Sequence, residues 1–187
     1  MVVPAPGQPA TDGADPDADP ADVARTLCLR WLTERPHTRE ELAAKLAKKG
    51  VPPPAVSAVL DRFVEVGLVD DAAFAASWVQ SRHTGRGLAR SALRQELRRR
   101  GVDEHTIEGA VEEVSTDDEA ARARALVARK LAATRGLDPA ARTRRLAAML
   151  ARKGYPPGVT YQVVREAISA DGTDPALAGM DAEAVDD

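Results

Sequence analysis

The sequence predicts an all-α fold built from tandem three-helix repeats. Only six of its 187 residues are aromatic, whereas Ala, Leu, Arg and Glu are abundant, so helix is favoured and a β-sandwich is not expected. A unit of the form Leu-x3-Leu-x3-Gly occurs three times, ending at Gly50, Gly101 and Gly154, with offsets of 51 and 53 residues. Periods of this size in a helix-rich chain indicate repeated units that bury their apolar faces against their neighbours.

The first repeat illustrates the expected elements. Residues 23–35 form a lead helix that ends before Pro36, which a helix does not readily continue through. Thr38 and Glu41 have the spacing of a capping box, so a second helix starts there and ends at Gly50. A third apolar helix follows the glycine. Basic residues precede the glycine in every copy.

Helices that follow each copy complete the repeat. Asp70 and Asp71 open a helix whose apolar side carries Phe74 and Trp78, and these aromatic residues are assigned to the core. The third copy has helices at 139–153 and 157–169, and the phase of the repeat stays open. With the lead helix counted in the first repeat, the predicted segments are a disordered tail at 1–22, repeats at 23–81, 82–134 and 135–170, and a disordered tail at 171–187.

Charge is segregated along the chain. Residues 1–22 hold five acidic and no basic residues, and residues 171–187 hold six acidic and no basic residues. Subtracting these eleven negative charges from the net charge of −3 leaves +8 on residues 23–170. A basic core predicts an acidic partner such as nucleic acid or a nucleoprotein, while acidic tails keep a protein soluble or screen its basic surface.

Several classes of protein are not expected. The single cysteine, Cys28, lies in an apolar run, which predicts a core position and excludes an internal disulfide. The sequence has neither a signal peptide nor an apolar run of membrane-spanning length, so we expect a cytoplasmic protein that does not contact membranes. We also expect a monomer.

Candidate catalytic and metal-binding residues have simpler structural interpretations. The pairs Asp70-Asp71 and Asp117-Asp118 stand where helices begin, and carboxylates there cap free N–H groups. The glycine-rich Gly85-Arg86-Gly87 lacks the lysine of a phosphate-binding loop and is predicted to be a helix-entry turn. The histidines are too far apart for a zinc helix and are expected on the surface: His37, His83 and His105. We therefore expect no enzyme activity, no metal and no cofactor.

Arginines recur every fourth residue between Arg82 and Arg98, a spacing that keeps near neighbours on one side of a helix. Like charges four apart disfavour a helix by about 0.2 to 0.5 kcal/mol each, so an anionic partner relieves a local cost. The alternative interpretation is a solvated basic face; the repeat of basic clusters favours contact. The predicted partner-binding residues are Arg82, Arg86, Arg90, Arg94, Arg98, Arg99 and Arg100, with Lys48, Lys49, Arg152 and Lys153 at the equivalent ends of the other copies.

One stretch of the chain resembles a known family. The residues Gly67-Leu68-Val69-Asp70-Asp71-x-x-Phe74-Ala75-x-x-Trp78-Val79-x-x-Arg82, followed by Leu93-x-x-Glu96-Leu97-x3-Gly101-Val102, resemble the signature of the RecX regulatory proteins. The resemblance covers about residues 24–170. It implies an elongated, curved array of three-helix repeats. The long acidic tails are not part of the family pattern.

The resemblance also implies a function. RecX proteins bind the RecA filament on DNA and inhibit it, so the chain is expected to limit the recombinase, ATPase and coprotease activities of RecA during DNA repair, recombination and the SOS response. Whether the arginines contact RecA, single- or double-stranded DNA, or both stays open. The alternatives are a helix-turn-helix transcriptional regulator, which usually needs polar base-reading residues at a helix start, and an adaptor array for an unrelated protein.

Overall fold

The computed structural model describes residues 19–172, and in this range all regular structure is helical. The predicted all-α class is confirmed. A short 3-10 helix, Ala132–Thr134, follows α7. The α-helices are α1 (Pro20–Glu34), α2 (Arg39–Lys48), α3 (Pro53–Glu65), α4 (Asp71–Arg86), α5 (Arg90–Arg99), α6 (Glu104–Glu112), α7 (Thr116–Leu131), α8 (Pro139–Arg152) and α9 (Pro157–Ala170).

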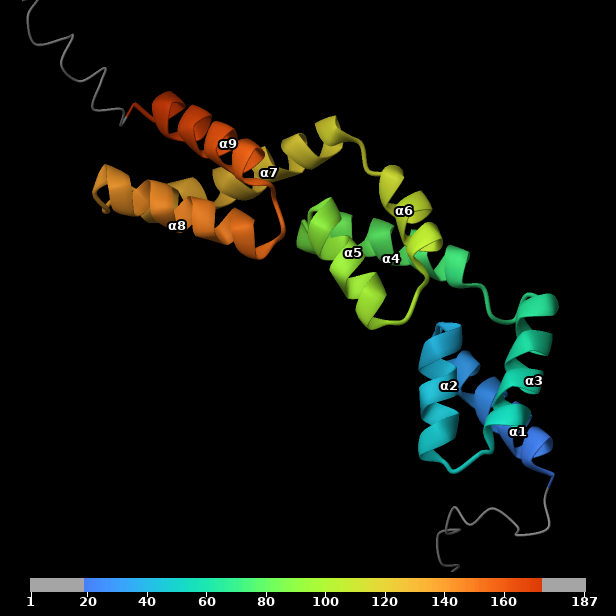
Figure 1. Ribbon diagram of the computed structural model, residues 1–187. Helices are drawn as coiled ribbons and strands as arrows, with labels where there is room; N and C mark the ends of the chain where they lie inside the picture. Colours follow the sequence, from blue (N-terminus) through green and yellow to red (C-terminus); the bar gives the residue numbers. More distant parts are fainter. Residues whose placement is uncertain (1–18, 173–187) are drawn as a thin grey trace, which may run out of the picture. The chain divides into compact units, whose positions relative to one another are not determined.

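The helices pack in consecutive groups of three, as Figure 1 shows. One apolar cluster is formed mainly by α1 to α3, a second by α4 to α6, and a third mainly by α7 to α9. The lead helix of each group therefore packs with the two helices that follow it. The sequence had left open which helix begins each repeat, and in the structure the groups begin at α1, α4 and α7. Residue 82, the predicted start of the second repeat, lies inside α4. The predicted curvature of the array stays a prediction.

The repeated glycine ends the second helix of each group. Gly50, Gly101 and Gly154 have φ angles of 79°, 75° and 86°, a left-handed conformation that glycine adopts without steric cost. In each copy the next residue donates its backbone N–H to the second leucine of the motif, for example Tyr155 to Leu150 at 3.2 Å. This pattern satisfies carbonyl groups that a helix end leaves free. The Leu-x3-Leu-x3-Gly unit therefore encodes both the buried stripe and its end.

Side-chain caps start most of the helices. The predicted caps at Thr38 and Asp70 are confirmed, since their side-chain oxygens accept hydrogen bonds from the backbone of Glu41 and Ala73. In the second copy the cap is Ser115, and Asp117 and Asp118 lie in the first turn that follows it. Carboxylates in a first turn favour the helix through its macrodipole.

Three local predictions need correction. The turn at Gly87 ends α4 with a φ of 63°, so it is a helix exit and not a helix entry. His37 is only 3% exposed, although a surface position was expected, because both of its ring nitrogens have partners on α2, Glu41 and Lys45. Helix α1 begins at Pro20, capped by Asp19, and is therefore longer than the predicted lead helix. The predicted disordered tails otherwise lie outside the described residues, apart from residues 171–172.

The predicted core positions are mostly confirmed. Cys28 and Leu97 are fully buried, and Phe74 is 8% exposed. Trp78 is half-buried and stacks on Phe74, with 5.7 Å between the ring centroids. Burial raises the pKa of the Cys28 thiol to about 11, so this cysteine is a protonated core residue at neutral pH.

Residues 70–172 belong to one compact unit, in which the second and third repeats meet through hydrogen bonds. The amide of Ala89 donates to the carbonyl of Lys153 at 2.9 Å, and the hydroxyl of Ser91 donates to the carbonyl of Gly154 at 2.6 Å. The buried hydroxyl of Tyr155 donates to the carbonyl of Gly87 at 3.1 Å. The start of α5 is thus fixed to the end of α8.

A buried arginine joins the start of α8 to the end of α9. Arg142 is 1% exposed and donates to Thr134 at 3.1 Å and to Asp171 at 2.5 Å. Arg135 also donates to Asp171, at 2.7 Å. The hydrogen bonds from Arg135 and then Arg142 hold the pKa of Asp171 far below its usual range. The last turn of α9 is therefore held by a charged carboxylate.

This carboxylate predicts a pH-dependent stability. Because the folded pKa of Asp171 is depressed, its contribution is complete above the unfolded pKa of about 3.9 and is lost as the pH falls through the folded pKa. Asp171→Asn is expected to lower the melting temperature at pH 7, and the gap to the parent protein should narrow below about pH 4. Thermal unfolding followed by circular dichroism checks this. A gap of equal size at pH 7 and pH 3 would contradict the role of the charge.

Candidate functional site

The predicted arginine stripe is divided between two helices. Arg82 and Arg86 lie in the last turns of α4, whereas Arg90, Arg94 and Arg98 lie on α5. The left-handed Gly87 separates the two sets, so the spacing of four does not continue through the stretch. The stripe is therefore two short rows with different neighbours.

The arginine of the family signature is engaged within its own repeat. The guanidinium carbon of Arg82 lies 4.0 Å from the centre of the Trp78 ring, and that of Arg100 lies 3.7 Å from it. The Trp78 indole donates to the carboxylate of Glu96 at 2.9 Å, and Arg82 forms an ion pair with the same carboxylate at 3.5 Å. Arg82 is thus a half-buried part of the α4 to α5 packing.

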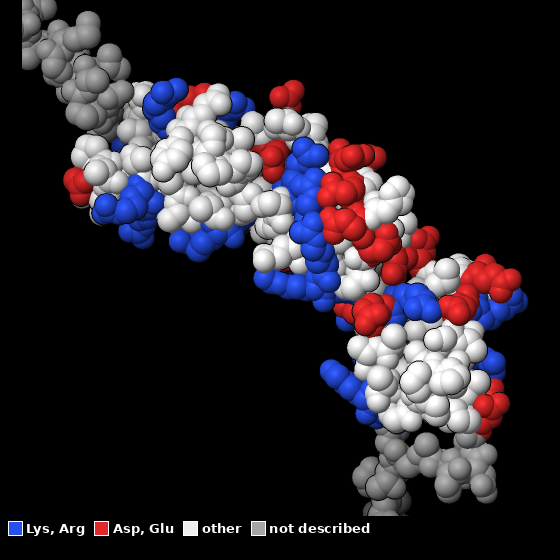
Figure 2. All heavy atoms as spheres, in the orientation of Figure 1, with Lys and Arg blue, Asp and Glu red and all other residues white. Residues whose placement is uncertain are grey.

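Two further arginines of the stripe are paired with glutamates of α6. Arg94 donates to both oxygens of Glu108 at 2.8 Å, and Arg98 contacts both oxygens of Glu104. Figure 2 shows the result as a band of cationic atoms directly beside a band of anionic atoms in this part of the molecule. The hydrogen bonds raise the arginine pKa values and lower those of the glutamates. This face is therefore locally neutralised.

The pre-glycine basic residues occupy the same place in each repeat, at the end of its second helix. Cations there favour the helix through its macrodipole, apart from any contact with a partner. Arg99 and Lys48 are exposed last residues of α5 and α2. Arg100 and Lys49 are the C-caps that follow them. Arg152 and Lys153 end α8 in the same way, but they also line a cleft.

This basic cleft lies in the compact unit from Asp70 onward, where the end of α4 meets α7 and α8. It has a volume of about 600 Å³ and no acidic residue lines it. Leu88, Leu126 and Met149 supply apolar surface between the charges. Its six cations come from three helices and one C-cap: Arg86, Arg122, Arg129, Lys130, Arg152 and Lys153.

Two of these cations fix the cleft. The Lys153 ammonium donates to the carbonyl of Arg86 at 2.5 Å, and Arg122 donates to the carbonyl of Thr84 at 2.8 Å. They neutralise the negative end of the α4 macrodipole while they join the second repeat to the third. The spacing of the cleft walls is therefore set by the fold.

The other four cations are exposed to solvent: Arg86, Arg129, Lys130 and Arg152. No carboxylate of residues 19–172 forms an ion pair with any of them. Their charges are thus not compensated locally, in contrast to those of Arg94 and Arg98. Gathered around one concave surface, they can bind a polyanion by the attraction that dominates contacts with phosphate backbones.

Half of the cleft cations were predicted from the sequence. Arg86, Arg152 and Lys153 were predicted, whereas Arg122, Arg129 and Lys130 were not. The last three lie on α7 without a regular spacing. The other cleft cations lie far from them in the chain, at the end of α4 and at the end of α8. The one feature of the sequence that points to these three cations is the apolar face of α7, because its Leu126 also lines the cleft.

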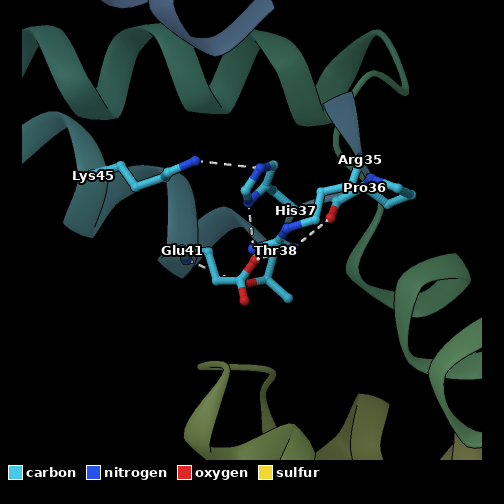
Figure 3. Close-up of polar contacts among 6 residues, drawn as sticks. All are labelled: Arg35, Pro36, His37, Thr38, Glu41 and Lys45. Atoms are coloured by element: carbon cyan, nitrogen blue, oxygen red, sulfur yellow. Dashed lines mark hydrogen bonds and ion pairs between the residues drawn. The ribbon is translucent and has the colours of Figure 1, made fainter. Parts of the chain in front are cut away.

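A buried polar cluster in the unit that ends at Val69 is a second candidate site (Figure 3). Nδ1 of His37 lies 3.0 Å from the Glu41 carboxylate, and Nε2 lies 3.4 Å from the Lys45 ammonium. Because an ammonium only donates, Nε2 accepts and Nδ1 carries the hydrogen. Burial, followed by the charge of Arg35, lowers the pKa of His37, which favours this neutral form.

The arrangement of this cluster indicates a structural role. The Thr38 hydroxyl beside it is occupied as the cap of α2. Lys45 also lies over the Trp31 ring, 4.5 Å from its centre. The cluster therefore ties the loop after α1 onto α2.

Within residues 19–172, no group of three or more histidine, cysteine or acidic side chains is placed to hold a metal ion. None of the helices in that range combines the length and hydropathy needed to cross a bilayer.

The repeats match known domains one by one. Residues 24–63, 70–111 and 117–164 match the family models for the first, second and third three-helix domains of RecX. The regulatory protein RecX of Streptomyces coelicolor is 54% identical over 160 residues, which cover 86% of this chain and 85% of that protein. The regulatory protein RecX of Thermobifida fusca is 52% identical over 172 residues, covering 88% and 93%.

Solved structures share the fold. The crystal structure of RecX from Lactobacillus salivarius superposes with a TM-score of 0.73 at 16% identity, covering 79% of this chain and 96% of that one. A second crystal structure of a regulatory protein RecX gives a TM-score of 0.71 at 24% identity. With all three domains present in order and relatives above 50% identity, the chain belongs to the RecX family of regulatory proteins.

Proposed function

We propose that this protein binds the RecA recombinase filament and inhibits its recombinase, ATPase and coprotease activities, acting in the cytoplasm as a monomer. Membership of the RecX family supports a regulatory role. The observation that carries the proposal is the basic cleft, whose six cations have no acidic residue among the lining. A nucleoprotein filament offers a repeated array of phosphates to such a surface.

The proposed mechanism is occupancy and needs no bond to form or break. Arg86, Arg129, Lys130 and Arg152 contact phosphates or acidic groups of the filament, while Lys153 and Arg122 keep the cleft open. Binding then blocks addition of further RecA subunits or the repacking that ATP hydrolysis requires. We propose the exposed helix ends at Lys48, Lys49 and Arg99 as outlying contacts of the same kind.

The paired arginines have a different proposed role. Arg82 supports the packing of α4 on α5, and Arg94 and Arg98 hold α6. Exchanging an ion pair for a contact with a partner gains little, because the charge is already compensated. These residues act through the shape of the second repeat.

The test uses RecA assembled on single-stranded DNA. Adding the purified protein is expected to slow ATP hydrolysis, and raising the salt concentration should weaken this effect, because each phosphate contact releases counterions. The assay follows phosphate release at several salt concentrations. Unchanged hydrolysis at stoichiometric excess contradicts the proposal.

A further inference from the structure

The end of the chain and the basic cleft carry opposite charges. Residues 173–187, which lie outside the described range, contain five acidic and no basic residues. The cleft has six cations, four of which lack an ion pair among residues 19–172. Opposite charges on one chain attract each other unless geometry keeps them apart.

The described structure ends near the C-terminal end of α7, the helix that carries three of the cleft cations. Asp171 is fixed by Arg135 and Arg142, and with Leu131 it lines a groove along one side of α7. Arg129 and Lys130, immediately before Leu131, line the basic cleft on another side of the same helix. The acidic segment therefore leaves the fold at the end of α7 that carries two of the cleft cations.

The segment is long enough to follow the cleft. Fifteen residues in extended conformation span up to about 50 Å. The cleft extends along α7 from Lys130 to Arg122, about 12 Å at 1.5 Å per residue. Its carboxylates can therefore reach cations along the whole cleft.

We propose that residues 173–187 occupy the basic cleft and compete there with the anionic partner, so that the protein regulates its own contact surface. The competition rests on the proposed function, because that function names the anionic partner. Occupancy of the cleft by residues 173–187 is independent of the proposed function. A tethered segment of this length has an effective concentration of about 1 mM, so a contact with a dissociation constant below about 1 mM fills the cleft for more than half of the time.

The acidic N-terminal segment is the less suitable occupant. Residues 1–18 contain three acidic residues, fewer than the C-terminal segment. They precede the compact unit that ends at Val69, whereas the cleft belongs to the unit that starts at Asp70. The C-terminal segment is attached directly to the unit that carries the cleft.

Occupancy can be measured in the full-length protein without RecA or DNA. In Met180→Cys, a nitroxide spin label will attach to the new thiol, because Cys28 is fully buried and its pKa is raised to about 11. The label is expected to broaden the amide resonances of Arg86, Arg129 and Arg152 in low salt. Amides near Tyr161, in a groove between α8 and α9, serve as the reference.

Two charge-reversal pairs on this background separate the cleft from net charge. Arg129→Glu with Arg152→Glu should abolish the broadening at the cleft. The control pair is Arg144→Glu with Arg145→Glu, which replaces two exposed arginines of α8 that do not line the cleft. It makes the same change in net charge and should retain the broadening at the cleft. Broadening that is absent, spread evenly, or equal in the two variants would overturn the proposal.

Competition is measured with a fluorescent deoxythymidine oligonucleotide of about fifteen nucleotides. Neutralising the five acids of residues 173–187 with Asn and Gln should tighten binding on the order of fivefold, because the cleft is then free. The same change in the Arg129→Glu, Arg152→Glu background should have no more than a small effect. Equal tightening in both backgrounds would show long-range charge and not occupancy, and would overturn the competition. If the label contacts the cleft but RecA is unaffected, the proposed function fails and cleft occupancy stands.

Discussion

Replacing Arg129 and Arg152 together by glutamate is expected to raise the concentration needed for half-inhibition of the RecA ATPase about tenfold. An exposed ion pair contributes up to about 1 kcal/mol, and reversal replaces each attraction by a repulsion of similar size. A loss of about 1.4 kcal/mol is already tenfold in affinity. Both residues are exposed and have no ion pair within residues 19–172, so their replacement breaks no salt bridge there.

The matched control for this experiment is Arg144→Glu with Arg145→Glu. It makes the same charge change on α8 at two positions that do not line the cleft. The cleft residues of the same helix are Met149 and Arg152. Inhibition by this control should stay within about twofold of the parent protein, because neither residue lines the cleft and salt weakens the attraction of exposed charges that make no direct contact. The two variants should have the same helical circular-dichroism signal. Equal loss of inhibition in both would assign the effect to net charge.

The salt dependence gives a second, independent reading of the same pair. Each phosphate contact that is lost lowers the slope of log affinity against log salt by about one. The cleft variant should therefore lose about two units of slope, whereas the control should lose none. A reduced affinity with an unchanged slope would indicate that Arg129 and Arg152 contact groups other than phosphates.

The repeat was predictable because its signals are local. The leucine spacing, the cap residues and the left-handed glycine each act within about ten residues, and together they define the second helix of every group. Most of the residues that carry the family resemblance lie within one repeat. Trp78, Glu96 and Arg82 form one network inside the second repeat, so the signature describes how α4 packs on α5.

The candidate site was only partly predictable because its geometry is tertiary. The pairing of Arg94 and Arg98 had a signal in the sequence, since Glu104 and Glu108 repeat the spacing of four on the next helix. The basic cleft had none comparable. Its walls are set by contacts such as that of Lys153 with Arg86, which join residues 67 positions apart.

The buried His37 shows the same limit at short range. The sequence predicted a surface position for His37, because its spacing from the other histidines does not suit a metal site. Its burial depends on Glu41 and Lys45, which lie four and eight residues later and supply partners for both ring nitrogens. A polar side chain is buried at low cost only when its partners are present, and those partners become visible once the helix is built.

Gly154→Ala is expected to destabilise the joint between the second and third repeats by about 2 to 5 kcal/mol. The φ of 86° is a left-handed conformation that costs a side-chain-bearing residue about 1 to 2 kcal/mol. A β-carbon there would also lie 2.6 Å from the Ser91 hydroxyl and 2.7 Å from the backbone nitrogen of Ala92. Overpacking of this kind adds about 1 to 3 kcal/mol, because the backbone of α5 has to move.

The equivalent glycine of the first repeat is the matched control. Gly50 has nearly the same φ, 79°, but a β-carbon there would meet no heavy atom within 4 Å. Gly50→Ala therefore carries the backbone cost alone, about 1 to 2 kcal/mol. The difference between the two variants isolates the collision with α5.

Hydrogen exchange locates the effect. The amide of Ala89 is buried and donates to the carbonyl of Lys153, so its protection reports directly on the joint. Gly154→Ala should lower that protection at least tenfold, whereas Gly50→Ala should leave it unchanged, because local opening is measured bond by bond. If the joint also sets the cleft, Gly154→Ala should weaken RecA inhibition with every cleft cation still in place. Full protection of Ala89 in this variant would show that α5 accommodates the methyl group and that the joint does not depend on a bare backbone at Gly154.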